Sequence, residues 1–529
     1  MKLVKIFSDK VQIKTDSACL KNLKINDLLI LADDAVSIVC IVTGLTGNDA
    51  LDVYDYDHDL LGQTASNNVI DCGILGSLVN GKFTKSIDIY PTTNVEISIL
   101  DNEAFIDMIR SDGDSVFRLG TYTNYNTRAG LNGNKFFQRH FAILGNTGSG
   151  KSVTVSSLLE KLSALQSSNV ILFDLHGEYQ GLDFVKTVKI GNGGLNFPLW
   201  FMPFRDIYSN IFRLKEESAT LQLSALRKAY YSARRSKKSE DIPIPFRLND
   251  ILDALKDANE DIINTGEFYK TGDKAGQAKT VKGENNGKLT SLIAILADKM
   301  LDARYSFMCE EQPQNYLYTF INEVYGISEK NVKVVDLSDV PHDMVPVIIA
   351  IITKLIYKTQ LQLKRDTMSP VDYHPLCIVC EEAHAYIPSN GFGLGASQRR
   401  LLEIFEIIAK EGRKFGTALG IVSQRPSELN KTIMAQCANF IVLKITNETD
   451  KSMVKGILPE SSQSIIDTLS LFSAGDCLVI GDAADITLKI KIDLPSEMPK
   501  SGTINTWDVW RDDRWLDIDV LVDGLLVDK

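Results

Sequence analysis

The sequence predicts an α/β protein with a parallel-type central sheet, a small β-barrel before it and a helical insertion within it. Three observations support this fold class. Short β segments separated by Asn, Asp and Gly fill residues 1–110, apolar strands alternate with longer helical stretches from His140 onward, and residues 205–330 have a helical pattern. A chain of 529 residues is also too long for one ordinary core, so several domains are expected.

The first of these domains is the predicted barrel. Its candidate strands are short and are separated by turn residues, which is the spacing of a small antiparallel barrel. The four runs are 28–31, 36–43, 69–79 and 95–100. We therefore expect residues 1–110 to form a β-barrel domain.

Composition and charge limit the possible functions. The chain is 44% hydrophobic and 24% charged, as in globular proteins. A net charge of −11 argues against a surface covered with nucleic-acid contacts, but it is compatible with a basic channel inside an acidic ring. The longest apolar run, 345–352, is too short to span a bilayer, and the N-terminus lacks the features of a signal peptide. We expect a cytoplasmic protein without a membrane segment.

The central sheet should contain six apolar runs, each followed by polar residues. These runs are 140–144, 170–174, 332–337, 376–380, 419–423 and 440–445. Ligands of open α/β sheets bind outside the carboxyl ends of the strands, so the polar residues that follow them should converge. The sheet and its helices are expected to occupy residues 111–204 and 331–498.

Two segments lie outside this core. The insertion at 205–330 includes a Gly-, Lys-, Thr- and Asn-rich stretch from Asn264 to Lys288, which we interpret as a mobile loop. Within the insertion, Arg227, Arg234 and Lys238 have a spacing that would place them on one helix face, either solvated or in contact with DNA. The tail at 499–529 contains three tryptophans, Trp507, Trp510 and Trp515, so we expect it to dock on a folded part.

A complete phosphate-binding loop, GNTGSGKS, lies between the first core strand and a helix. Glycines allow the backbone N–H groups to surround phosphates, Lys151 would reach the β and γ oxygens, and the Ser152 hydroxyl would ligate Mg²⁺. The residues expected to bind the nucleotide are Gly145, Asn146, Thr147, Gly148, Ser149, Gly150, Lys151 and Ser152. The sequence therefore predicts ATP and Mg²⁺ as cofactors.

Two acids follow the strand at 376–380. We assign Glu381 to the Mg²⁺ shell together with Ser152, and Glu382 to the orientation of the attacking water, because phosphoryl transfer depends on positioning and charge. Two acids at a helix N-terminus could instead stabilise the helix dipole without any nucleotide. The complete phosphate loop upstream favours the catalytic interpretation, and it disfavours a non-catalytic binding module.

Other polar residues lie at or near the remaining core strands. Asp174 is a candidate for a supporting catalytic role, whereas His176 fits a catalytic or an ordinary loop histidine equally well. Gln424 could sense the γ-phosphate. Arg413 is a candidate arginine finger, which would enter the site of a neighbouring subunit; its alternative is a solvated charge at a helix end.

These motifs resemble those of the HerA-like branch of the HerA/FtsK ATPases. GNTGSGKS, FDLHGEY, IVCEEAH, KEGRKFG and VSQRPSEL occur in this order, and the similarity covers roughly residues 135–495. The resemblance implies a RecA-like motor behind a HerA-type barrel, assembled as a homo-oligomer, a hexameric ring on double-stranded DNA. It also implies a nuclease or other effector partner, and a position near the nucleotide for Arg139.

The predicted function is an ATP-driven DNA translocase or helicase that works with such a partner in DNA end processing or antiphage defence. Two alternatives stay open. The ATPase could be a nucleotide-gated scaffold that assembles an effector without moving along DNA. It could also be a conjugation or secretion ATPase, although such proteins need a membrane anchor that this sequence lacks.

Overall fold

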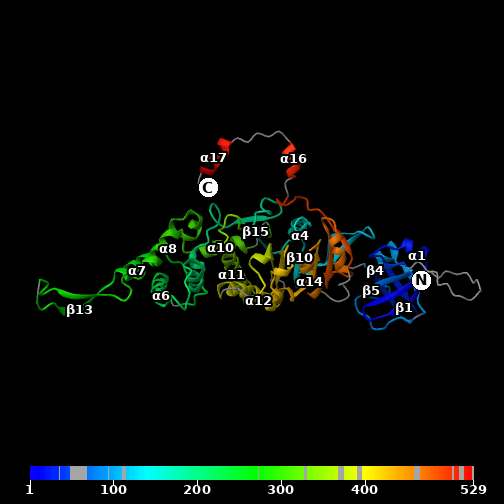
Figure 1. The fold of residues 1–529 in the computed structure, drawn as a ribbon, viewed down its shortest axis with the longest axis horizontal. Coiled ribbons are helices and arrows are strands. Elements are labelled where there is room, and N and C mark those ends of the chain that lie inside the picture. The colour runs from blue at the N-terminus through cyan, green and yellow to red at the C-terminus, as the bar shows by residue number, and fades with distance from the viewer. Residues whose placement is uncertain are drawn as a thin grey trace, which may run out of the picture.

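The computed structural model has an elongated shape, with an N-terminal sheet at one end, an α/β core in the middle and a helical part at the other end (Figure 1). The structure describes residues 1–34, 36–47, 68–92, 94–109, 115–236, 238–271, 273–326, 330–366, 374–389, 396–457, 465–502, 505–511 and 518–526. 

The N-terminal part is a seven-stranded antiparallel sheet with the order β1-β2-β5-β4-β3-β7, and β6 beside β5. Its strands are β1 (Lys2–Ile6), β2 (Lys10–Thr15), β3 (Leu28–Ala32), β4 (Ser37–Thr46), β5 (Asn68–Val79), β6 (Lys82–Thr84) and β7 (Glu96–Ile99). Among the described residues β1 and β7 do not pair, so the predicted barrel is confirmed only as an antiparallel sheet.

The core is an eleven-stranded sheet with the order β12-β15-β11-β16-β17-β10-β18-β19-β20-β8-β9. The run from β12 to β18 is parallel, as predicted, and the last four strands are antiparallel. The strands are β8 (Val116–Tyr122), β9 (Thr127–Asn132), β10 (His140–Leu144), β11 (Val170–Asp174), β12 (Lys186–Lys189), β15 (Val332–Asp336), β16 (Leu376–Cys380), β17 (Thr417–Ser423), β18 (Cys437–Val442), β19 (Asp476–Gly481) and β20 (Lys489–Ile492). All six expected core runs form strands.

Helices cover both faces of this sheet. In Figure 1, α4 (Lys151–Ser163) lies on one face, and α11 (Val345–Asp366) and α12 (Ala396–Glu411) lie on the other. The apolar run at 345–352 begins α11, and every residue of that run except Pro346 is buried, which explains its composition. None of the described helices is long and apolar enough to cross a membrane.

The insertion is helical, but it also contains a β-ribbon. Its helices are α6 (Thr220–Arg234), α7 (Leu248–Glu260), α8 (Thr290–Leu301), α9 (Ser306–Cys309) and α10 (Tyr316–Val324). The stretch that we expected to be a mobile loop instead contains most of two antiparallel strands, β13 (Ile262–Phe268) and β14 (Ala278–Lys282). The expectation was wrong because the chain turns back through Gly276, whose φ of +80° suits glycine, and the backbones of the two strands then pair.

Of the three basic residues expected on one face, Arg227 and Lys238 are exposed and fit a solvated face, whereas Arg234 is buried. Arg234 is 3% exposed, and its guanidinium donates hydrogen bonds to the carbonyl oxygens of Lys238, Ser239 and Ile242. The guanidinium of Arg227 lies 5.2 Å from the centre of the Phe204 ring. Arg234 therefore holds the segment that follows this helix, and a role in DNA contact does not fit it.

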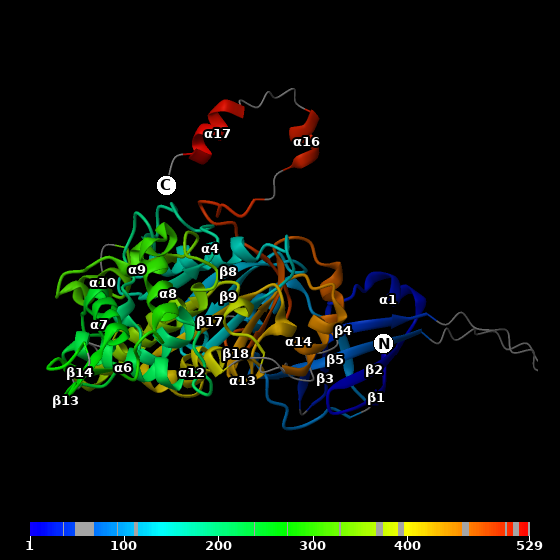
Figure 2. The same ribbon diagram turned by 60° about the vertical axis from the view of Figure 1, so that its left-hand side comes forward.

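The tail forms α16 (Thr506–Arg511) and α17 (Ile518–Leu526), which stand away from the body in Figure 2. Trp507 and Trp510 are 73% and 77% exposed, so within one chain they are not covered. Trp515 lies outside the described residues. Docking of the tail stays a prediction. The surface that would cover Trp507 and Trp510 would have to come from another molecule.

Close packing at the centre of the sheet leads to a first prediction. A Cβ atom at Gly420, in β17, would lie 2.4 Å from Cζ of the buried Phe141. We expect Gly420→Ala to destabilise the core by about 1–3 kcal/mol, because the ring has no room to move. Thermal unfolding followed by circular dichroism should show the loss.

Gly456 in α14 (Glu448–Ile457) provides the matched control, since a Cβ there would meet no atom within 4 Å. Gly456→Ala should be neutral or stabilising by up to about 1 kcal/mol. Equal melting temperatures for the two variants would contradict the packing argument.

Candidate active site

The candidate site lies at the carboxyl edge of the parallel strands. The strands β11, β16, β17 and β10 are neighbours in the sheet, so the segments that follow them meet. The Thr147 hydroxyl of the phosphate loop donates a hydrogen bond to Oε1 of Gln424, which follows β17. The predicted convergence of these motifs is therefore present.

The phosphate loop has a tightly fixed backbone. Gly150 has a φ of +99°, and a Cβ there would lie 2.9 Å from the backbone nitrogen of Gly475. Gly475 N–H donates to the Ser149 carbonyl oxygen at 2.9 Å. Lys151 begins α4 and is only 7% exposed, with Nζ 3.4 Å from the Asn146 carbonyl oxygen. A buried ammonium at the start of a helix, where the first backbone N–H groups have no acceptor within the helix, forms a site for an anion.

Glu381 and Glu382 extend from the end of β16 toward this loop. Glu381 is 3% exposed, and burial together with the negative charge of Glu382 raises its pKa to about 8 despite the opposing charge of Lys151. Glu382 has a φ of +45° and a ψ of +44°, which is unusual for a residue with a side chain. Such strain is typical of functional positions, because the fold must hold it in place.

His384 lies against the Glu382 side chain. Its Nδ1 is 3.2 Å from Oε2 of Glu382 and 3.3 Å from Oγ of Ser423 at the end of β17. Burial raises the pKa of Glu382, but the imidazole of His384 and the charge of Lys151 lower it by more, so its net pKa is below the ordinary value. The contact favours the ionised form of Glu382.

Asp174 holds the turn that follows β11. Its Oδ1 accepts hydrogen bonds from the backbone N–H groups of His176 and Gly177 at 3.1 and 2.9 Å, and its Oδ2 accepts one from Tyr179 at 2.9 Å. The turn brings Glu178 and Tyr179 toward Glu381. Burial raises the pKa of Tyr179 and of Glu381, and the charge of Glu178 raises both further. Asp174 therefore contributes through the turn, and His176 is exposed.

The donor set fits a divalent cation. Five buried atoms around the phosphate loop have no hydrogen-bond partner among the described residues: Ser149 Oγ, Glu178 Oε2, Tyr179 OH, Glu381 Oε2 and Glu382 Oε2. No cluster of three His, Cys, Asp or Glu side chains in the described part could hold a metal by itself. A cation here would therefore need ligands from the nucleotide and water, which is how Mg²⁺ binds in phosphate-transferring sites.

Arg139 and Arg413 lie at the opposite edge of the sheet. Arg139 precedes β10 and Arg413 precedes β17, whereas the nucleotide loop follows β10. Both arginines line one cavity of about 410 Å³, together with Lys85, Lys135 and Asp485 among others. A five-residue strand spans roughly 16 Å, so neither guanidinium serves the phosphate loop of its own chain.

His140 holds the two arginine-bearing segments together. Its Nδ1 accepts a hydrogen bond from the Leu419 N–H at 2.9 Å, which leaves Nε2 to donate to the Ala409 carbonyl oxygen at 3.0 Å. Burial lowers the pKa of this imidazole, in agreement with the neutral tautomer. Because Ala409 lies in α12, just before Arg413, the contact fixes Arg413 relative to Arg139.

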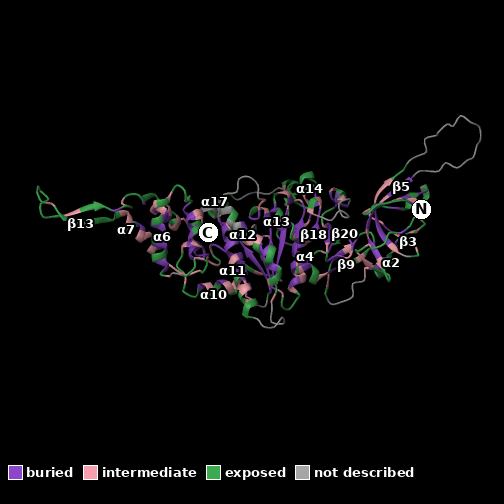
Figure 3. Cartoon of the chain, turned by 90° about the horizontal axis from the view of Figure 1, so that it is seen from below, coloured by how far each residue is buried: buried purple, intermediate pink, exposed green. Residues whose placement is uncertain are grey.

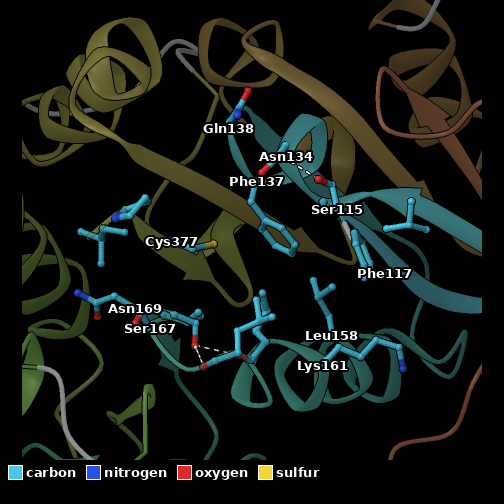
Figure 4. Close-up of a pocket in the computed structure, with 18 residues that line it drawn as sticks. Ser115, Phe117, Asn134, Phe137, Gln138, Leu158, Lys161, Ser167, Asn169 and Cys377 are labelled. Atoms are coloured by element: carbon cyan, nitrogen blue, oxygen red, sulfur yellow. Dashed lines mark hydrogen bonds between the residues drawn. The ribbon is translucent and has the colours of Figure 1, made fainter. Parts of the chain in front are cut away.

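A second cavity lies near the amino ends of the core strands (Figure 4) and has a volume of about 570 Å³. Its walls are mainly apolar and include Phe117, Phe137 and Leu158, with Lys161 and Asn134 among the polar lining residues. None of the residues predicted for the nucleotide site lines it. It is therefore separate from the phosphate loop.

Comparison with known proteins now identifies the family. The model of the central domain of helicase HerA matches residues 117–356. The "DNA double-strand break repair helicase HerA" of Saccharolobus solfataricus is 29% identical over 413 residues, which cover 77% of this chain and 74% of that protein. The chain is a HerA-like ATPase. The proteins of the same name from Sulfolobus acidocaldarius and Pyrococcus furiosus are 28% and 25% identical, and the matches cover 78% and 84% of this chain and 76% and 80% of theirs.

Solved structures with a similar arrangement include VirB4 of Thermoanaerobacter pseudethanolicus, with a TM-score of 0.47 and 16% identity over 72% of this chain and 97% of that one. The bacterial conjugative coupling protein TrwB has a TM-score of 0.43 and 13% identity, over 75% of this chain and 94% of that one.

The phosphate loop and the two acids of this HerA-like ATPase were predicted from the sequence. Three residues beside them in the site, Glu178, Tyr179 and His384, were assigned no role. Glu178 and His384 were part of the quoted motifs, and their position directly after core strands could have marked them as site residues. Tyr179, whose pKa burial raises far above its ordinary value, gave no such signal because an aromatic residue after a strand is usually packed in the core.

The contact of His384 with Glu382 leads to a prediction about pH. We expect His384→Ala to raise the pKa of Glu382, because burial then acts without the imidazole that lowers it. The acid limb of ATP turnover should move to higher pH, since the carboxylate is lost earlier as pH falls. His384→Asn, which keeps a side-chain donor, should shift the limb less.

The measurement is kcat at saturating ATP across the acidic range, with folding of each variant checked at every pH. Superimposable profiles for the wild type and both variants would show that His384 does not control Glu382.

Proposed function

We propose that this HerA-like ATPase is a ring-shaped motor that drives double-stranded DNA through its centre and hydrolyses ATP at sites shared between neighbouring copies. One observation carries the proposal. The phosphate loop with Glu381 and Glu382 lies at one edge of the sheet, and Arg139 with Arg413 lies at the other. A chain with two half-sites facing opposite ways is suited to head-to-tail assembly.

Each residue would have a defined task in hydrolysis. Backbone N–H groups of the loop and Lys151 would bind the β and γ phosphates, and Gln424, held by Thr147, would lie beside the γ-phosphate. Glu382, ionised and held by His384, would orient the attacking water. Arginines from the neighbouring copy would stabilise the charge that develops, since a guanidinium stays charged and is weakly hydrated.

Ser152 and Glu381 would hold Mg²⁺ together with the nucleotide. When bound, Mg²⁺ would neutralise negative charge on the phosphates. Its charge would also lower the pKa of Glu381, which burial and the neighbouring acids otherwise raise. This carboxylate therefore suits a cation site, because the charge of Lys151 alone does not offset its burial and the neighbouring acids.

The substrate and the partners are inferred from the relatives, which are named as double-strand break repair helicases. We propose a hexamer that acts on double-stranded DNA with a nuclease or other effector, in DNA end processing or antiphage defence. The N-terminal sheet would complete a barrel of the HerA type. The tail at 499–529 would dock on another copy, since Trp507 and Trp510 are uncovered in one chain.

The function is tested by coupling of ATP turnover to movement on DNA. Linear duplex DNA should raise the ATPase rate of the purified protein, and the protein should displace a third strand from a triplex in an ATP-dependent reaction. Glu382→Gln is the matched control. It should bind ATP and DNA but lose about 10²-fold or more in turnover, because water is no longer oriented by a carboxylate.

An ATPase rate indifferent to DNA, with no strand displacement, would contradict the motor. That result would favour a scaffold whose nucleotide state gates an effector.

A further inference from the structure

The β13–β14 ribbon is the most exposed structured element of the helical part. Residues 262–282, hereafter the arm, project from the end of α7 beyond the rest of the molecule (Figure 1). Every residue of β13 is exposed, as Figure 3 also shows, and the two strands pair only with each other. An isolated two-stranded ribbon is at best marginally stable in water, so an arm of this kind needs a covering surface.

The arm carries apolar side chains that no described part of the chain covers. Ile262 is 62% exposed, Ile263 is 49%, Phe268 is 61% and Val281 is 50%. Ile263 and Val281 are directly paired across the strands and add to one apolar patch. The arm has apolar side chains on both faces and an unpaired edge on each strand. Contact with another protein would therefore stabilise it more than contact with water.

The charge of the arm differs from that of the whole chain. Residues 262–282 contain four lysines and two acids, a net charge of +2, whereas the chain has a net charge of −11. The rest of the chain therefore carries −13. Lys279 already pairs with Glu267 at 3.1 Å, while Lys270, Lys274 and Lys282 form no ion pair with the described part of the chain. The arm is thus complementary to an acidic surface.

Helix α7 presents such a surface. Asp253, Asp257 and Glu260 are exposed and spaced i, i+4 and i+7, which places them on one face of the helix. Lys256 lies beside this face and pairs with Asp253 at 3.8 Å, so the three acids and this lysine leave a net charge of −2. The opposite face is buried through Leu248, Ile251 and Leu255. The arm of the same chain begins directly after α7 and extends away from it, so it does not cover this face (Figure 1).

We propose that the arm docks on the acidic face of α7 in a second copy of this chain. The arm and the α7 face are different surfaces, so the contact is heterologous and repeats from copy to copy, as a ring requires. Phosphates could also pair with the lysines, so duplex binding is the competing outcome that the test below separates. This inference rests on the proposed ring, and it assigns one of its contacts.

The test is a charge exchange in the full-length protein. Lys270→Glu, Lys274→Glu and Lys282→Glu together reverse the arm, and Asp253→Lys, Asp257→Lys and Glu260→Lys together reverse the α7 face. Each triple variant should raise the protein concentration needed for half-assembly by about tenfold or more, because like charges then meet. A chain with all six changes should assemble nearly as the wild type does. Sedimentation velocity at low salt provides the measurement.

The outcomes separate the two proposals. If the wild type assembles and both triple variants assemble equally well, the arm contact is overturned while the ring stands. If the wild type stays monomeric with ATP and DNA present, the ring itself fails. If the reversed arm leaves assembly unchanged but weakens duplex binding in a mobility shift, the arm contacts DNA and not a second copy. Unchanged ATP binding in each variant verifies folding.

Discussion

The catalytic arrangement depends on one constraint, the common direction of the parallel strands. Because β11, β16, β17 and β10 run the same way side by side, everything that follows them meets at one edge and everything that precedes them lies at the other. This brings Thr147 into contact with Gln424 across 277 positions of sequence. The same constraint separates Arg139 and Arg413 from the phosphate loop, and no rotation of their side chains within one chain compensates for the length of a strand.

Polar side chains at the nucleotide edge of the sheet are buried and fixed in place before a charged ligand binds. Lys151 and Glu381 are buried, and Glu382 keeps a left-handed backbone conformation. Burial of charges is costly unless they are paired, so their cost must be offset by packing elsewhere in the core or by a ligand. The surrounding contacts limit motion: Asp174 ties the turn after β11, and His384 ties Glu382 to Ser423. A preorganised site of this kind stabilises developing charge without first rearranging.

Much of this arrangement could be predicted from the sequence, and the exceptions have physical reasons. The six core strands follow from apolar runs that are buried on both faces, and the loop follows from the spacing of its glycines and Lys151. The antiparallel strands β8, β9, β19 and β20 have weaker hydrophobic patterns than the six core strands. The strands of the arm were not predicted because a register shift between Asn264 and Phe268 interrupts the alternation of residues along β13. Arg139 was placed near the nucleotide by resemblance alone, although its position before β10 already assigns it to the other edge. The roles of the individual site residues stay predictions.

The central claim is that two copies of this chain form one active site, and subunit mixing tests it most directly. Lys151→Ala removes the cation of the phosphate loop, and Arg413→Ala removes a charge worth about 10³-fold or more in rate if it acts as an arginine finger. Each variant alone should be nearly inactive. Mixed under conditions of subunit exchange, they should regain part of the wild-type ATPase rate, because some interfaces then join an intact loop to an intact Arg413. A monomer that hydrolyses ATP at the full rate would contradict the claim.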